Sequence, residues 1–320
     1  MPYEVPSPDP QGEAHLFTAP QGGQRLDRTL ADCLPQLSRA QIQRLIDEGR
    51  VLVDGLRVKA GQKLRGGESL LVRLPPPQDS TPQPEDIPLD VVYEDDDLVV
   101  IDKPAGLVVH PSLGNVSGTL VNALLYRYPQ MVDMQGDEDS EGRLGIVHRL
   151  DKDTSGLLVV ARHLDALRNL MAQFQARTVK KYYLALLDRR PKTSTGLIDA
   201  PIGRDPRERQ KMSVLASGKP AQTEFELLED RYAGGRALVR LHLLTGRTHQ
   251  IRVHMAFIGC PVVGDTVYGL RKSSIPALKR HFLHAHSLSF DHPRTGERLS
   301  FQSPLPDDLQ ALLESLREVI

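Results

Sequence analysis

The sequence predicts an α+β fold in which a largely antiparallel sheet follows a small α/β module. Three observations indicate this fold class. Strand-like segments outnumber helical ones beyond residue 88, and the two kinds do not alternate regularly as in a doubly wound fold. A proline-rich stretch separates them from a shorter unit with its own helices and strands. The 320 residues, 40% of them hydrophobic, are enough to give two domains a core.

Composition divides the chain into four segments. Residues 1–20 contain five prolines and few large apolar side chains, so we expect a flexible tail. Residues 21–74 form the small module, and residues 75–87 form a Pro-rich linker on which we expect this module to move. Residues 88–320 form the larger domain, in which we expect the chemistry to take place.

In the small module, leucine and isoleucine side chains recur at helical spacing in two successive segments. Ser38 is typical of a helix N-cap and Gly49 of a helix end, which places the second helix between them. Asp54 and Gly55 predict a hairpin turn. The helices carry Leu26, Leu30 and Leu34, then Ile42, Leu45 and Ile46, and the strands cover Val51–Val53 and Ser69–Leu74.

The larger domain shows more strands than helices. Expected strands are Val91–Tyr93, Leu98–Ile101, Leu107–Val109, Leu157–Val160, Tyr182–Leu187, Ala237–Leu244 and His286–Phe290, and expected helices are Thr119–Arg127, Asp165–Gln175 and Asp307–Val319. No run of about 18 apolar residues occurs, so we expect neither a membrane span nor a signal peptide.

Charge is distributed unevenly. The whole chain has a formal net charge of -1, whereas residues 25–73 hold ten Lys+Arg against six Asp+Glu, an excess of four. This excess indicates a phosphate-binding face on the small module, with Arg25, Arg39, Arg44 and Lys59 as candidates, although a merely solvated surface stays open. Cys33 and Cys260 are the only cysteines and lack CxxC spacing, so we expect a cytoplasmic protein without disulfides.

The densest polar cluster lies between two apolar runs, at residues 145–160. Asp151 follows Arg149 and precedes Lys152, and such cations favour a charged carboxylate that acts as nucleophile or general base. A surface turn remains the alternative. The spacing imitates a calcium loop, but Arg162 stands where that loop needs a bidentate glutamate. An aspartyl-phosphate site is disfavoured because no Gly-rich phosphate loop accompanies it.

A second polar cluster follows the predicted strand Ala237–Leu244. Residues 236–254 hold four arginines and no acid, and the Thr245-Gly246 turn leaves Arg247 at a strand end. We expect Arg247 to meet Asp151 from a neighbouring strand, with a phosphate-binding or solvated arginine as the alternative. The nearby histidines accompany neither a cysteine cluster nor an HExxH helix, so we predict no metal site.

These clusters resemble the RluA-type pseudouridine synthases. The motifs that carry the resemblance are His148-Arg149-Leu150-Asp151 with Lys152 to Gly156, Thr245-Gly246-Arg247-Thr248-His249-Gln250-Ile251-Arg252, Ile101-Asp102-Lys103-Pro104-Ala105-Gly106-Leu107, Lys181-Tyr182-Tyr183-Leu184-Ala185 and Gly264-Asp265-Thr266-Val267-Tyr268-Gly269. Residues 25–73 are similar to the family's small α-L RNA-binding module. Phrases at residues 114–125 and 201–212 resemble the RluD branch, which modifies 23S ribosomal RNA, ahead of the RluC branch and of RluA and TruC.

The resemblance implies an isomerase that converts uridine in RNA to pseudouridine. Asp151 would start cleavage of the N1–C1′ bond on a flipped-out uridine, by attack on C1′ or by proton abstraction from the sugar. Tyr183 would stack on the base and help remove the C5 proton, Arg247 would pair with Asp151, and Arg149 would fill the vacated space.

His249 and Arg252 are expected to face the RNA. Neither metal nor cofactor is expected, and the enzyme is expected to act as a monomer. The alternatives are a catalytically silent RNA-binding factor and a nucleoside hydrolase, which would need a second carboxylate.

Overall fold

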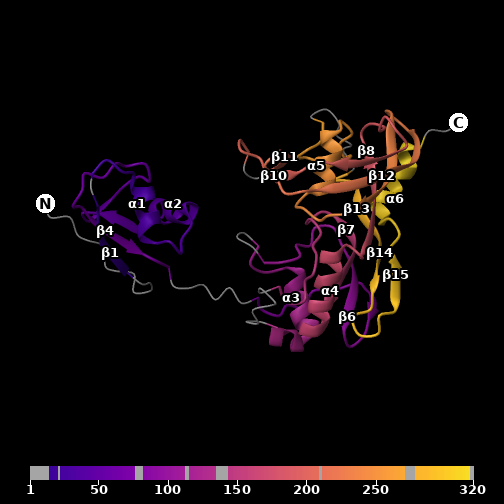
Figure 1. The fold of residues 1–320 in the computed structure, drawn as a ribbon, viewed down its shortest axis with the longest axis horizontal. Coiled ribbons are helices and arrows are strands. Elements are labelled where there is room, and N and C mark those ends of the chain that lie inside the picture. Colours follow the sequence, from indigo (N-terminus) through magenta and orange to yellow (C-terminus); the bar gives the residue numbers. More distant parts are fainter. Residues whose placement is uncertain are drawn as a thin grey trace. The chain divides into compact units, whose positions relative to one another are not determined.

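The computed structural model describes residues 14–20, 22–75, 82–111, 115–134, 143–208, 211–270 and 278–317. Contacts within the chain separate two compact units, Met1–Thr81 and Pro82–Ile320 (Figure 1). Each unit has its own hydrophobic core, so each is described by itself.

The first unit packs two short helices on a small antiparallel sheet. Ser38 caps the second helix through a reciprocal pair of hydrogen bonds with Gln41, as its sequence predicts. Asp54 and Gly55 both have positive φ, 49° and 79°, and connect two strands. The elements are β1 (Ala14–Thr18), α1 (Leu26–Cys33), α2 (Arg39–Asp47), β2 (Val51–Val53), β3 (Leu56–Arg57) and β4 (Ser69–Arg73), and the strand order is β1-β4-β2-β3.

The end of the expected tail is not flexible, which corrects the sequence prediction. Strand β1 pairs with β4 from Ala14 opposite Arg73 to Thr18 opposite Ser69. Phe17 packs against the core of the unit, and this burial outweighs the prolines on which the prediction rested. Residues 1–13 lie outside the described residues.

Part of the expected linker contacts the second unit. The Glu85 backbone N–H donates to the Asn122 carbonyl at 3.0 Å, and the Asn122 side chain donates to the Gln83 carbonyl at 2.7 Å. Residues 76–81 lie outside the described residues, so the movement of the first unit on this linker stays a prediction.

The second unit is built around a mixed sheet of nine strands within the described residues. Its path is β5-β6-β7-β14-β8-β13-β12-β9, with β15 paired to β14, and only β7 and β14 are parallel. The predicted α+β fold with a mainly antiparallel sheet is therefore confirmed. The strands of this sheet are β5 (Val91–Glu94), β6 (Leu98–Lys103), β7 (Ser155–Ala161), β8 (Lys180–Leu187), β9 (Thr195–Asp199), β12 (Gln222–Tyr232), β13 (Arg236–Leu243), β14 (Leu283–Asp291) and β15 (Arg298–Gln302), and a separate hairpin joins β10 (Ile202–Arg204) to β11 (Met212–Val214).

Helices cover this sheet, and α4 packs on β7 (Figure 1). The helices are α3 (Leu120–Arg127), η1 (Pro129–Met134, a 3-10 helix), α4 (Leu164–Ala176), α5 (Gln250–Phe257) and α6 (Asp307–Leu316). Three of them match the predicted helices to within a few residues, whereas α5 is not among those predicted. The expected strand Leu107–Val109 is wrong, because that segment makes only an isolated bridge from Val108 to Thr119.

Candidate functional site

Asp151 lies in the loop that leads into the buried strand β7. Gly156 lets this strand run against β14, because a Cβ at Gly156 would lie 2.3 Å from the Ala285 carbonyl oxygen. The φ of Gly156 is +112°, a conformation that residues with a side chain rarely adopt. The loop with Asp151 therefore enters the sheet where β7 and β14 form the one parallel strand pair of this sheet.

Lys103 from β6 holds the loop that carries Asp151 through hydrogen bonds to backbone carbonyls. Its side chain is fully buried, and its ammonium group donates to the carbonyls of Pro104, Leu107 and Lys152 at 2.8–3.0 Å. Burial lowers the pKa of Lys103 to about 8, although Asp153 and Asp151 oppose this effect. The Lys152 carbonyl also accepts from the Gly106 backbone at 2.8 Å, so the residue after Asp151 is tied to two neighbours.

A second support comes from the segment before β14. Arg280 donates to the Ser155 hydroxyl at 3.0 Å, and His281 shares a 2.8 Å hydrogen bond with the Thr154 hydroxyl. His284 contacts the Ser155 hydroxyl at 3.0 Å. Burial lowers the pKa of His281 to about 4, so this histidine is neutral near pH 7. These residues hold the two hydroxyl side chains that follow Asp151 in the chain, a role that the sequence did not reveal.

Asp151 pairs with Arg252, which corrects the expectation that Arg247 would fill this place. The Arg252 Nη1 atom lies 3.0 Å from Asp151 Oδ2, whereas the Arg247 side chain donates to the Pro220 carbonyl at 3.0 Å. The reason is the helix α5, which begins at Gln250 and turns Arg252 inward. Arg252 is buried, and it was expected only to face the RNA.

Arg252 is anchored by a second carboxylate. Its Nε and Nη2 atoms donate to the two oxygens of Asp265 at 2.7 and 3.0 Å, and the Asp265 side chain is fully buried. The backbone N–H groups of Val267 and Tyr268 also donate to Asp265. Burial opposes the charge of Arg252, yet the bonds and charges of Asp265 and Asp151 raise its pKa above the ordinary value.

Tyr183 lies close to Asp151 in the same site. It comes from β8, where it is opposite Leu241 of β13, and only 6% of its surface is exposed. Burial, and then the charge of Asp151, raise the pKa of Tyr183 well above its ordinary value. The phenol therefore loses its proton even less readily than an ordinary tyrosine.

Asp151 and Tyr183 line one cavity of about 700 Å³. This volume exceeds that of a single base, and falls in the range of small-molecule sites. Among the described residues that line it, Asp151 is the only carboxylate, whereas five Arg or Lys side chains reach the cavity. The cationic lining residues are Arg143, Arg149, Arg177, Lys181 and Arg247.

The other predicted RNA-facing residues lie in both units. Arg149 is exposed at the cavity, and His249 begins α5 with a φ of 55° while its Nδ1 lies 2.8 Å from the Tyr268 hydroxyl. Burial lowers the pKa of His249, with the charge of Asp151 opposing it. In the first unit, Arg25 and Arg39 both pair with the buried Asp27, while Arg44 and Lys59 are exposed.

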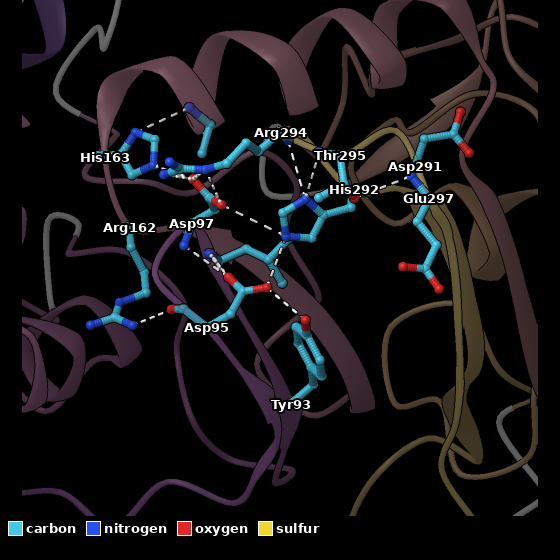
Figure 2. Close-up of polar contacts among 12 residues, drawn as sticks. Tyr93, Asp95, Asp97, Arg162, His163, Asp291, His292, Arg294, Thr295 and Glu297 are labelled. Carbon is cyan, nitrogen blue, oxygen red and sulfur yellow. Dashed lines mark hydrogen bonds and ion pairs between the residues drawn. The ribbon is translucent and has the colours of Figure 1, made fainter.

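The described residues contain one group whose atoms lie close enough together to hold a metal ion. Oxygen and nitrogen atoms of Asp95, Asp97 and His292 lie within 4.8 Å of one another. Figure 2 shows that protein groups already contact them. His292 Nε2 lies 2.9 Å from Asp95, its Nδ1 accepts from the backbone of Arg294 and Thr295, and Arg294 forms a fork on Asp97. This arrangement connects two turns of the sheet, and we assign it a structural role.

None of the helices in the described ranges is both long and apolar enough to cross a lipid bilayer. Residues 97–257 match the family model described as RNA pseudouridylate synthase, and residues 24–70 match the S4 domain. The matched ranges contain Asp151, Tyr183 and Arg252 in the second unit and Arg25, Arg39, Arg44 and Lys59 in the first.

Known proteins resemble the chain over most of its length. An RNA pseudouridine synthase of Chloroflexus aurantiacus is 53% identical over 310 residues, covering 96% of this chain and 95% of its own. Ribosomal large subunit pseudouridine synthase D of Nitrosomonas europaea is 48% identical, and the match covers 93% of this chain and 86% of the relative. The structure of human RNA pseudouridylate synthase domain containing 1 matches with a TM-score of 0.56 and 33% sequence identity. The match covers 71% of this chain and 88% of the human chain. The resemblance expected from the motifs is confirmed, and the chain belongs to the RNA pseudouridine synthase family.

Proposed function

We propose that this enzyme converts specific uridines of large-subunit ribosomal RNA to pseudouridine. The observation that carries the proposal is the geometry around Asp151, a carboxylate held by Arg252 beside Tyr183 in a cationic cavity. The ribosomal substrate class is supported by the relatives named pseudouridine synthase D, including the Nitrosomonas europaea enzyme at 48% identity. RNA is polyanionic, and a cavity with five cationic side chains and one carboxylate attracts it.

Asp151 is the proposed catalytic residue. A flipped-out uridine enters the cavity, and Asp151 either attacks C1′ or takes a proton from the sugar, so that the N1–C1′ bond breaks. Arg252 holds the carboxylate through a single hydrogen bond, which orients it and leaves its other oxygen for the sugar. The cavity keeps the free base in place until C5 bonds to C1′.

Tyr183 and Arg149 are proposed to hold the substrate. Tyr183 is proposed to stack on the base, and because burial raises its pKa further, loss of its own proton to act as the base for the C5 proton becomes harder. Arg149 is exposed at the cavity, where its side chain can fill the space that the flipped uridine leaves. Arg247 lines the same cavity and is proposed to contact the RNA backbone, because it does not hold Asp151.

The first unit is proposed to bind RNA outside the catalytic cavity. Arg25 and Arg39 each use two nitrogens on the buried Asp27, and half of each arginine side chain is exposed. This arrangement presents fixed cations toward phosphate groups. Arg44 and Lys59 add exposed charge to the same unit.

Incubation of the purified full-length protein with a large-subunit ribosomal RNA transcript tests the proposal. Mapping of pseudouridine by mass spectrometry is expected to find it at few positions, and Asp151→Asn is expected to abolish it. Absence of product with the wild type, or full product with Asp151→Asn, would overturn the assignment. Release of free uracil would instead favour the nucleoside hydrolase, and tight binding without chemistry would favour the silent RNA-binding factor.

We also propose a cytoplasmic, monomeric enzyme. Cys33 and Cys260 are both free thiols, which suits a reducing compartment. Light scattering coupled to gel filtration tests the monomer, and a mass near twice that of the chain would contradict it.

A further inference from the structure

Lys181 is a cation of the cavity that contacts no acidic side chain of the described residues. It lies on β8 two residues before Tyr183, so both side chains point to the same face of the strand. Its ammonium group lies 5.1 Å from the centre of the Phe174 ring, on α4. Unlike Arg252, which two carboxylates hold, the ammonium group of Lys181 forms neither an ion pair nor a hydrogen bond with the residues that the structure describes.

The surroundings of Lys181 make its charge costly. Burial lowers the pKa of Lys181 to about 8. His148 stacks on Phe174 at 4.8 Å, and burial together with the charge of Lys181 lowers the pKa of His148 to about 3, so this histidine brings no charge. An ammonium group that leaves water with only an aromatic ring beside it is poorly compensated, and an anion bound next to it would offset that cost.

The proposed reaction supplies two kinds of anionic oxygen. On the attack route, a bond forms from Asp151 to C1′ as the N1–C1′ bond breaks. On the proton-abstraction route, the C2′ proton passes to Asp151, the electrons of that C–H bond form a C1′=C2′ double bond, and the N1–C1′ bond breaks. The electron pair leaves with the uracil in both cases, and the negative charge spreads over its ring nitrogens and carbonyl oxygens. The second source is a phosphodiester group beside the target nucleotide.

We propose that Lys181 binds an anionic oxygen of the RNA substrate, on the uracil or on a neighbouring phosphodiester. This inference rests on the proposed function, because it needs RNA in the cavity. Arg149 and Arg177 also line the cavity, but both are exposed, and water screens their charge more than that of the partly buried Lys181. Lys181 is therefore the cation whose charge depends most on the substrate.

Replacement of Lys181 by Met tests this role, and Lys180→Met is the matched control. Lys180 is the preceding residue of β8, and its side chain is exposed. Loss of a charge-assisted contact is expected to lower kcat/KM of Lys181→Met by about tenfold to a hundredfold, while Lys180→Met stays near the wild type. A fall in kcat alone assigns the contact to the cleaved uracil, and a rise in KM alone assigns it to the phosphodiester.

The inference is overturned if Lys181→Met and Lys180→Met have the same kcat and KM as the wild type. An inactive wild type would instead overturn the proposed function, so the two failures are distinguishable. Thermal melting of each variant shows whether a loss of activity reflects unfolding.

The variant Lys181→Arg keeps the inference testable should Lys181→Met not fold. The other ionisable groups among the described residues that line the cavity are His110, Arg143, His148, Arg149, Asp151, Arg177, Tyr183 and Arg247. Lysine loses its charge as the pH rises through about 8, whereas arginine keeps it. The wild type is expected to lose activity between pH 7 and 9 more steeply than Lys181→Arg, and identical pH profiles would contradict the role.

Discussion

Arg252 is shared by two carboxylates, and this sharing determines how Asp151 is held. Nε and Nη2 are used on Asp265, so only Nη1 donates to Asp151. A planar guanidinium group can serve both partners because its donors point in fixed, separate directions. An ammonium group has one nitrogen and cannot span the two carboxylates in this way. The arginine is therefore required by the geometry and not only by its charge.

Arg252→Lys is expected to lower kcat by about a hundredfold, the range for loss of one oriented electrostatic contact. Arg247→Lys is the matched comparison, because Arg247 lines the cavity but its Nε donates to the Pro220 carbonyl. We expect this second variant to change mainly KM for RNA. Single-turnover kinetics measure both effects. A larger fall in kcat for Arg247→Lys would show that the pairing of Asp151 with Arg252 does not govern the reaction.

Asp97 gives the second unit a pH-dependent contribution to stability. Hydrogen bonds from Arg294 lower the pKa of Asp97 to about 2 from an ordinary 3.8; burial opposes this, and His163 adds to the lowering. Because the pKa is depressed by folding, the stabilisation is complete above about pH 4 and is lost as the pH falls toward 2. The same turns contain Asp95 and His292 (Figure 2).

Asp97→Asn is expected to make the free energy of unfolding depend less steeply on pH between about 4 and 2. Urea titrations followed by circular dichroism at several pH values measure this slope. Asp230→Asn is the control, because the ion pair of Asp230 with Arg190 is largely exposed and contributes little. Equal slopes for Asp97→Asn and the wild type would contradict the role of Asp97.

At the scale of elements, strand β7 positions the catalytic loop by its close approach to β14. Gly156→Ala would place a Cβ 2.3 Å from the Ala285 carbonyl oxygen at a φ of +112°. The left-handed conformation costs about 1–2 kcal/mol and overpacking about 1–3 kcal/mol. We expect a loss of about 2–5 kcal/mol in unfolding free energy. Gly296 also has a positive φ, but nothing lies near the position of its Cβ, so Gly296→Ala should show only the cost of the left-handed conformation. Equal losses of unfolding free energy in the two variants would exclude a steric effect at Gly156.

Elements with a visible hydrophobic period were predictable from the sequence, and those without it were not. Helix α4 buries one face, and its range was predicted to within about a residue at each end. Helix α5 buries every residue from Gln250 to Met255, so no polar face marks it as a helix. The alternation of Ile251, Val253 and Met255 is instead typical of a strand. Because the sequence did not predict helix α5, Arg247 and not Arg252 was expected beside Asp151.

The density of polar residues indicated Asp151 and the family resemblance indicated Tyr183, but neither could reveal the groups that hold the loop. Lys103 and His281 are far from Asp151 in sequence and come from elements on either side of β7. Only the pairing of β7 with β6 and β14 brings them together. Asp265 belonged to a motif of the family resemblance, yet its fork on Arg252 required the position of α5. The pairing of strands that are far apart in the chain cannot be read from a single sequence.

At the scale of the whole molecule, we propose that the two units divide the work of binding RNA. The second unit has the cavity with Asp151, and the first carries an excess of basic residues. Phosphate contacts release counterions from RNA, so the affinity of such a surface falls as salt rises. The chain has a formal net charge of -1, which means that local charge and not total charge must attract the RNA.

Removal of two exposed cations from the first unit is expected to weaken the salt dependence of RNA binding. The double variant Arg44→Gln, Lys59→Gln leaves the Asp27 ion pairs intact, because neither residue contributes to them. The slope of log affinity against log salt should become shallower by about 1.4, since each phosphate contact on single-stranded nucleic acid contributes about 0.7. Filter binding from 50 to 300 mM salt, chosen to bracket roughly physiological ionic strength, measures it. The control variant Arg44→Lys, Lys59→Arg keeps both charges and should keep the slope. An unchanged slope in the Gln variant would show that Arg44 and Lys59 do not contact RNA.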